Sequence, residues 1–157
     1  MAIRVGEPAP DFALRGSQGN DPVKLSSFKG DKSVVLLFFP LAWTSVCTKE
    51  MCSIRDSYAE YGNLGAQVLG ISVDSAFALK AWAKEEGFPF PLLSDFNKDV
   101  SASYGALYDD QMGLKGVSKR AAFVIDRAGV VRHAEVLEKA SDLPDFEAVK
   151  RALNDAG

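Results

Sequence analysis

Cys47 and Cys52 are the two cysteines of the chain, and Cys47 lies where a thiol could be made reactive. It follows a run of apolar residues and the loop PLAWTSV, and it opens a segment with helical spacing. A thiol in the first turn of a helix lies next to unpaired N–H groups and the positive end of the helix dipole, and both favour the thiolate. Cys47 is therefore a candidate nucleophile. An isolated cysteine is more often a small buried apolar residue, so its surroundings in the sequence must decide.

The segments around this cysteine predict alternating strands and helices. Residues 33–39, SVVLLFF, show no polar alternation and suit a central strand covered on both faces. Apolar residues at helical spacing predict one helix over 47–61, and residues 68–73 predict a second buried strand. Residues 76–86 form an amphipathic helix pattern, and a short helix is expected over 99–104. This order indicates parallel strands with covering helices, and ligands usually bind at the carboxyl end of such strands.

Turn signals at both ends of the chain predict two hairpins. Residues 12–14 and 23–25 flank the turn-rich GSQGNDP, and residues 122–125 and 130–136 are separated by DRAG. Residues 145–153 close the chain as a helix pattern. A βαβ unit followed by ββα is the connectivity of a thioredoxin-like fold. We therefore predict an α/β protein of this fold, with a central mixed β-sheet flanked by helices and an N-terminal β-hairpin.

Length and charge restrict the class of protein. With 157 residues, 47% of them apolar, the chain suits a single domain over residues 1–157 with one core. The net charge is −3, and Lys and Arg are spread along the chain, so we expect no nucleic acid partner. The longest apolar stretch, residues 34–43, is about half of the roughly 20 residues that a spanning helix needs, so we expect no membrane segment.

The N-terminus and the few metal-binding residues indicate the compartment and exclude a metal. MAIRVGEPAP lacks the features of a secretory signal, so we expect a cytoplasmic protein. Thiols are kept reduced there, so Cys47 and Cys52 should not form a permanent structural disulfide. These cysteines and the one histidine, His133, fall short of the four ligands of a structural zinc site. We predict neither a metal nor a cofactor.

Pro40, Thr44 and Cys47 match the active-site pattern Pro-x-x-x-Thr/Ser-x-x-Cys of the peroxiredoxin family, and the whole chain resembles that family. The segments VGEPAPDFAL, FPFPLLSD at 88–95 and FVIDRAGVVR at 123–132 occur in the order expected of a member. A lone Thr-x-x-Cys would be weak evidence for the family, but this ordered set of segments over most of the chain is strong evidence. The resemblance implies an enzyme, a thiol-dependent peroxidase acting on hydrogen peroxide and organic hydroperoxides.

The resemblance also implies roles for individual residues. Cys47 would attack the distal peroxide oxygen, expel water or alcohol and become a sulfenic acid. Thr44 would hold the peroxide, because a hydroxyl donates and accepts at once. Pro40 would help to wall the thiolate from solvent, although it is equally compatible with a loop residue that ends a strand. Arg120 would be the fixed cation beside Cys47, because an antiparallel strand starts at the edge where its parallel neighbours end.

Two neighbouring charges bear on this assignment. Lys119 is the alternative cation, but the segment KRAAFVID, aligned with the family, points to Arg120. Glu50 follows Cys47 by one helical turn. It is a candidate to orient the arginine, and equally a solvated or helix-capping carboxylate.

Cys52 leaves the route of regeneration open. Its distance from Cys47 in CTKEMC is that of the bacterioferritin-comigratory (PrxQ-like) type, whose second cysteine resolves the sulfenic acid as an intramolecular disulfide. The loop PLAWTSVC instead resembles the one-cysteine alkyl hydroperoxide reductase E type, which needs an external thiol. A core-facing helical residue is the structural alternative for Cys52. We expect no intersubunit disulfide, because no cysteine lies near the C-terminus.

Two other classes of function fit the fold less well. A disulfide oxidoreductase would need Cys-x-x-Cys, which Cys47 and Cys52 do not form. A non-enzymatic interaction module would not need Thr44 and Arg120 together. The expected partners are a hydroperoxide substrate and a thioredoxin-like or other thiol reductant, with the protein a monomer or a homodimer.

Overall fold

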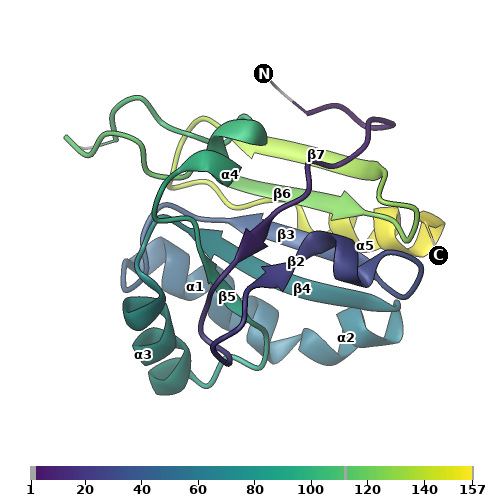
Figure 1. The fold of residues 1–157 in the computed structure, drawn as a ribbon, viewed down its shortest axis with the longest axis horizontal. Coiled ribbons are helices and arrows are strands. Elements are labelled where there is room, and N and C mark those ends of the chain that lie inside the picture. Colours follow the sequence, from purple (N-terminus) through teal and green to yellow (C-terminus); the bar gives the residue numbers. More distant parts are fainter. Residues whose placement is uncertain (1–2, 112, 157) are drawn as a thin grey trace.

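A mixed β-sheet forms the middle of the protein in the computed structural model, which describes residues 3–111 and 113–156 (Figure 1). Within those residues its strand order is β5-β4-β3-β6-β7. The strands are β3 (Ser33–Phe38), β4 (Ala66–Ser72), β5 (Leu92–Ser94), β6 (Arg120–Ile125) and β7 (Val131–Leu137). β3, β4 and β5 run parallel, whereas β6 and β7 are antiparallel to their neighbours. The predicted mixed sheet is confirmed.

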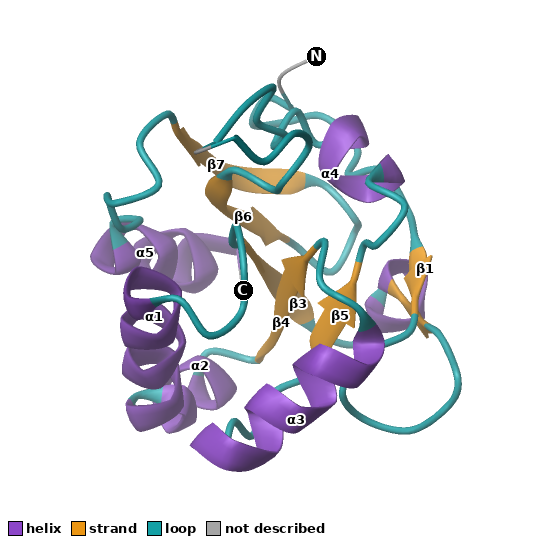
Figure 2. Cartoon of the chain, turned by 90° about the vertical axis from the view of Figure 1, so that its left-hand side faces the viewer, coloured by secondary structure: helices purple, strands orange, loops and turns teal. Residues whose placement is uncertain are grey.

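Helices and a small hairpin cover the two faces of the sheet (Figure 2). One face packs against α1 (Ser45–Asp56), α2 (Tyr58–Asn63), α3 (Ala76–Glu86) and α5 (Phe146–Ala156). The other packs against the hairpin region, η1 (Leu25–Phe28) and α4 (Asp99–Ser103); the hairpin strands are β1 (Ala13–Leu14) and β2 (Val23–Lys24). None of the helices in the described part of the chain is long and apolar enough to cross a membrane.

β3 is buried along its whole length, as its lack of polar alternation predicted. Successive side chains of a strand point to opposite faces. Val35 and Leu37 therefore pack with the helices of the first face, and Leu36 and Phe38 pack with the layer of α4 and the hairpin. The strand thus leads the chain out of the middle of the core to the loop that carries Cys47.

The helix predicted over residues 47–61 is wrong in one respect, because the structure divides it at Ser57. The Ser57 hydroxyl donates to the Ser53 carbonyl at 2.9 Å, and its N–H is shared between the Ser53 and Ile54 carbonyls at 3.2 Å. A serine that binds the carbonyl four residues back competes with the regular backbone bonds and bends the helix. α1 therefore ends as a separate helix that carries both cysteines.

β5 is the one strand of the sheet that the sequence pattern did not indicate. It spans three residues after Pro91, too few for a periodic signal. It is recognised only through its pairing with β4, where Gly70 lies opposite Leu92. The sequence pattern also gave no sign of η1, whereas the remaining elements agree with their predicted bounds to within a few residues.

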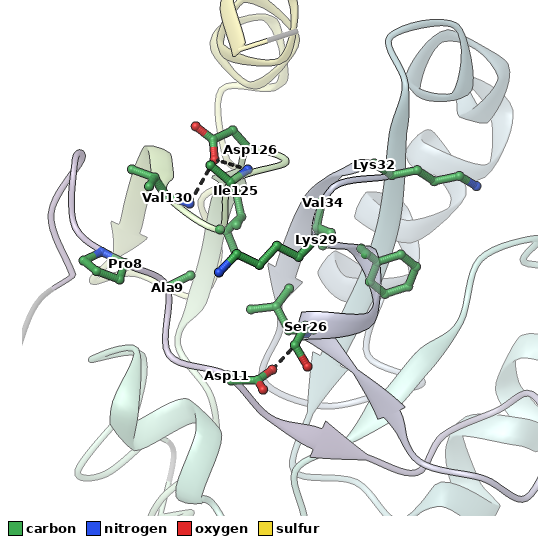
Figure 3. Close-up of a pocket in the computed structure, with 14 residues that line it drawn as sticks. Pro8, Ala9, Asp11, Ser26, Lys29, Lys32, Val34, Ile125, Asp126 and Val130 are labelled. Atoms are coloured by element: carbon green, nitrogen blue, oxygen red, sulfur yellow. Dashed lines mark hydrogen bonds between the residues drawn. The ribbon is translucent and has the colours of Figure 1, made fainter.

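A hollow of about 370 Å³ marks the end of the sheet opposite Cys47, where β3 begins and β6 ends (Figure 3). Asp126 closes the β6–β7 turn there, because its Oδ1 accepts the N–H groups of Ala128 and Val130 at 2.9 Å. Asp11 in turn accepts the Ser26 N–H at 2.9 Å. Backbone bonds fix the N-terminal segment to this end of the sheet, from the Gly6 N–H to the Val131 carbonyl at 2.8 Å and from the Ala9 N–H to the Gly129 carbonyl at 2.9 Å.

Candidate active site

A strained loop delivers the chain from β3 to α1. Trp43 has a φ of 71°, a left-handed conformation that costs a non-glycine residue of order 1 kcal/mol. The preceding Ala42 N–H donates to Asp74 Oδ2 at 2.8 Å, and the Ser72 hydroxyl at the end of β4 donates to the same oxygen at 2.7 Å. The loop is therefore anchored to the neighbouring strand. The loop places Thr44 at the N-cap position, directly before the first residue of α1.

Cys47 lies in the first turn of α1 and is 1% exposed. Its sulfur accepts a hydrogen bond from Arg120 Nη2 at 3.1 Å. A guanidinium at this distance attracts negative charge on sulfur, and the low polarity of the surroundings strengthens that attraction. The site thus combines a buried sulfur, a helix N-terminus and a fixed positive charge.

Arg120 is held on all sides of its guanidinium. It is the first residue of β6, and it is 1% exposed. Nε donates to the Ala140 carbonyl at 2.9 Å and Nη1 to Glu50 Oε1 at 2.7 Å, while Nη2 reaches Cys47. The strand direction predicted this position beside the cysteine, and the distance confirms it. Lys119, the alternative cation, instead pairs with Glu138 at 2.9 Å.

Glu50 is fully buried and binds the arginine, so it is not the solvated carboxylate that the sequence also allowed. Its Oε2 has no hydrogen-bond partner among the described residues. Burial raises the pKa of the Glu50 carboxyl to about 7, although the charge of Arg120 acts in the opposite direction. Glu50 therefore changes charge near neutral pH.

A hollow of about 730 Å³ opens over the sulfur. Pro40, Thr44, Cys47 and Arg120 line it together with an apolar wall, so the structure brings four of the five predicted site residues to one cavity; the wall includes Leu41, Val46, Leu114 and Val117. The Thr44 hydroxyl is exposed at the rim, where it donates to the Leu41 carbonyl at 2.9 Å. Its oxygen keeps lone pairs for a further donor. Trp43 does not line the hollow.

Cys52, the fifth predicted residue, lies apart from this cavity. It is half-buried on α1, and both cysteines are free thiols. Five residues along an ideal helix separate two α-carbons by roughly 8–9 Å. A disulfide tolerates at most about 7 Å, so the intact α1 keeps the two sulfurs from bonding.

Sequence reasoning missed the wall residues Leu114 and Val117, and it also missed the segment over residues 138–141. This segment lines the hollow, and the Ala140 carbonyl binds Arg120. Every residue has a backbone carbonyl, so the sequence does not indicate which one binds Arg120. Only the path of the chain after β7 identifies the Ala140 carbonyl as this acceptor.

The sequence matches known proteins over most of its length. The profile of the AhpC/TSA family matches residues 5–134. Alkyl hydroperoxide reductase E of Mycobacterium tuberculosis is 43% identical over 136 residues, which are 85% of this chain and 86% of the relative. A chloroplastic 2-cysteine peroxiredoxin of Chattonella marina var. antiqua is 39% identical over 145 residues, 87% of this chain and 72% of the relative.

Solved structures agree with the sequence matches. The crystal structure of peroxidoxin BcpB from Mycobacterium tuberculosis has a TM-score of 0.86 at 33% identity, over 98% of this chain and 97% of that one. The reduced 2-Cys peroxiredoxin of Plasmodium vivax has a TM-score of 0.83 at 32% identity, over 96% and 80% of the two chains. Fold and site together define a thiol peroxidase on a thioredoxin-like scaffold. The chain belongs to the AhpC/TSA family and is a peroxiredoxin.

The titration of Glu50 predicts a pH-dependent stability. Because the pKa of Glu50 is raised to about 7 in the folded state, the folded protein holds this proton more tightly than the unfolded chain does. The stability of the parent relative to Glu50→Gln should therefore fall as pH rises from 5 to 7, by about 2–3 kcal/mol at most, and level off above 7. Urea unfolding of both proteins at pH 5, 6, 7 and 8 measures this difference. A difference that stays constant with pH would contradict the assignment.

Proposed function

We propose that this peroxiredoxin reduces hydrogen peroxide and organic hydroperoxides with Cys47 as the attacking thiolate. The observation that carries the proposal is the hydrogen bond from Arg120 Nη2 to Cys47 Sγ at 3.1 Å, at the base of a hollow. The sulfur attacks the terminal peroxide oxygen, so an S–O bond forms as the O–O bond breaks. The leaving oxygen takes a proton and departs as water or an alcohol, and Cys47 becomes a sulfenic acid.

Ionisation of the sulfur alone cannot account for the rate acceleration that a peroxidase needs. An ordinary thiol with a pKa of about 8.5 is already a few per cent ionised at neutral pH, so complete ionisation gains only about 30-fold. A more acidic thiol is also less nucleophilic. The remaining acceleration must come from orienting the two oxygens and from stabilising charge on the leaving one. We assign this work to Thr44 at the rim and Arg120 at the base.

The size and the apolar lining of the hollow support the proposal that the enzyme accepts substrates larger than hydrogen peroxide. Pro40 is buried beside the sulfur and offers no N–H, so it supports the exclusion of water from the thiolate. Leu41, Leu114 and Val117 add apolar surface. A volume of about 730 Å³ accommodates the carbon skeleton of an organic hydroperoxide.

The serine variant of Cys47 tests the central assignment. Cys47→Ser is nearly isosteric, but its hydroxyl is far less acidic than a thiol, so peroxide consumption should be lost while the protein stays folded. Peroxide consumption with dithiothreitol as reductant measures the activity, and circular dichroism checks the fold. Normal turnover by the folded variant would refute the role of Cys47.

For regeneration, we propose that Cys52 attacks the sulfenic acid and forms an intramolecular disulfide, which a thioredoxin-type reductant then opens. Cys52 is only half-buried and lies on the same short helix as Cys47. Because the intact helix holds the two residues too far apart, α1 must unwind in part after oxidation. Such recycling needs a reducing compartment, such as the cytoplasm. The alternative is resolution by an external thiol.

Mass spectrometry after one equivalent of peroxide distinguishes these routes. The parent should lose two hydrogens as the disulfide forms, whereas Cys52→Ser should gain one oxygen on Cys47. If the parent also only gains oxygen, an external thiol resolves the sulfenic acid and Cys52 has a structural role.

A further inference from the structure

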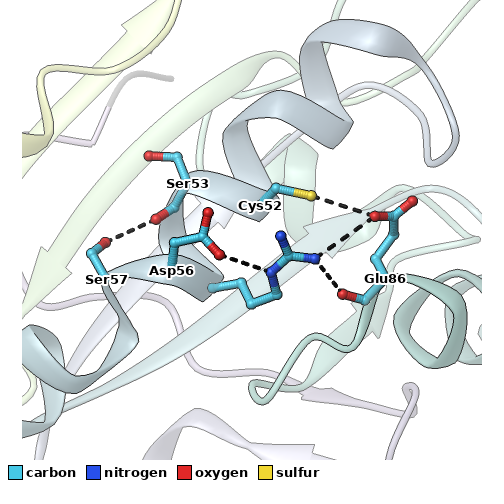
Figure 4. A network of polar contacts seen from close by, with 6 residues as sticks. Cys52, Ser53, Asp56, Ser57 and Glu86 are labelled. Carbon is cyan, nitrogen blue, oxygen red and sulfur yellow. Dashed lines mark hydrogen bonds and ion pairs between the residues drawn. The ribbon is translucent and has the colours of Figure 1, made fainter.

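The Cys52 thiol of α1 forms a hydrogen bond with a residue at the end of α3. Its sulfur lies 3.5 Å from Glu86 Oε2, and Figure 4 shows the side chain directed at that carboxylate. An ionised carboxylate can only accept a hydrogen bond, so the thiol makes this contact only while it keeps its proton. The contact thus selects the unreactive form of Cys52 and turns its sulfur towards α3.

Arg55 fastens the same two helices at the same point. Its Nη1 donates to the Glu86 carbonyl at 2.6 Å and lies 3.9 Å from Glu86 Oε2. Its Nε pairs with Asp56 Oδ1 at 3.1 Å (Figure 4). The second half of α1 is therefore held to the last turn of α3 through both Arg55 and Cys52.

The charges around the thiol act together against its ionisation. Burial raises the pKa of Cys52, the hydrogen bond to Glu86 raises it further, and Arg55 opposes both. The charges of Glu86 and Asp56 contribute in the raising direction. The network is thus arranged so that a thiolate at Cys52 would face two carboxylates.

The position of Glu86 is not explained by the helix that carries it. Glu86 is the last residue of α3, which Gly87 ends in a left-handed conformation. A carboxylate at a helix C-terminus meets the negative end of the helix dipole, which is unfavourable. The contacts of its carboxylate with Cys52 and Arg55 are therefore its structural contribution.

We propose that Glu86 is a positioning residue that holds Cys52 protonated and turned away from Cys47 until α1 unwinds, and so sets the rate of disulfide formation. This inference rests on the proposed resolving role of Cys52. In that step the Cys52 sulfur loses its proton and attacks Cys47 Sγ, so an S–S bond forms and the S–O bond breaks. The hydroxide leaves with the proton as water, while Cys52 is oxidised and Cys47 is reduced.

Glu86→Gln tests the proposal, with Glu85→Gln as a matched control on the neighbouring, exposed residue of the same helix. In a Cys47→Ser background, Glu86→Gln should make iodoacetamide alkylation of Cys52 at pH 7 faster by about 3- to 10-fold, because the pKa of the thiol falls. With both cysteines present, it should speed disulfide formation after peroxide addition by a similar factor. Stopped-flow quenching followed by mass spectrometry measures this step. Glu85→Gln should change neither rate.

The rate of sulfenic acid formation at Cys47 distinguishes a specific effect of Glu86 on Cys52 from a general loss of structure. It should be the same in both variants, because the Cys47 site is remote from Glu86 in the hydrogen-bond network. A slower disulfide step in Glu86→Gln would overturn the proposal and make Glu86 the base that ionises Cys52, and an unchanged step would overturn it as well. A parent that forms no disulfide would instead overturn the resolving role of Cys52, and this inference with it.

Discussion

The buried guanidinium of Arg120 is the group on which the arrangement of the site depends. A charge without solvent costs several kcal/mol unless its donors are satisfied. Here a carboxylate, a sulfur and a carbonyl satisfy them, and these come from α1 and from the segment after β7. Because the buried charge needs these partners, it holds β6, α1 and the segment after β7 together. The same contacts leave the cation facing the hollow in which a peroxide would lie.

α1 has two tasks that conflict. Its first turn must stay wound to hold Cys47 against Arg120, yet the proposed disulfide requires it to unwind. Two features of the structure bear on this conflict. The break at Ser57 separates α1 from α2, so unwinding one helix need not disturb the other, and the contacts of Arg55 and Cys52 with Glu86 oppose early release. Local stability at this helix thus links chemistry to conformation.

Sequence patterns predicted most of the fold, because β3 is a continuous apolar run, α3 carries a helical period, and the turns are marked by glycine and proline. Strand direction predicted a cation beside Cys47 at the start of β6, and the resemblance to the family selected Arg120 over Lys119. Other features depend on tertiary contacts: the short strand β5 on pairing with β4, the break at Ser57 on local hydrogen bonds, and the Ala140 carbonyl on the path of a loop. The catalytic roles of the site residues, the single domain and the oligomeric state stay predictions.

The rate of Cys47 oxidation by peroxide, measured by stopped flow above the pH at which the thiolate is fully formed, tests most directly whether positioned groups drive the reaction. Under that condition Thr44→Val and Arg120→Met should each slow oxidation by about 30- to 1,000-fold, equivalent to about 2–4 kcal/mol. Lys119→Met, which removes the neighbouring surface charge, should leave the rate within about twofold of the parent. If the Thr44 and Arg120 variants react at the parent rate once the thiolate fraction is matched, the account is wrong.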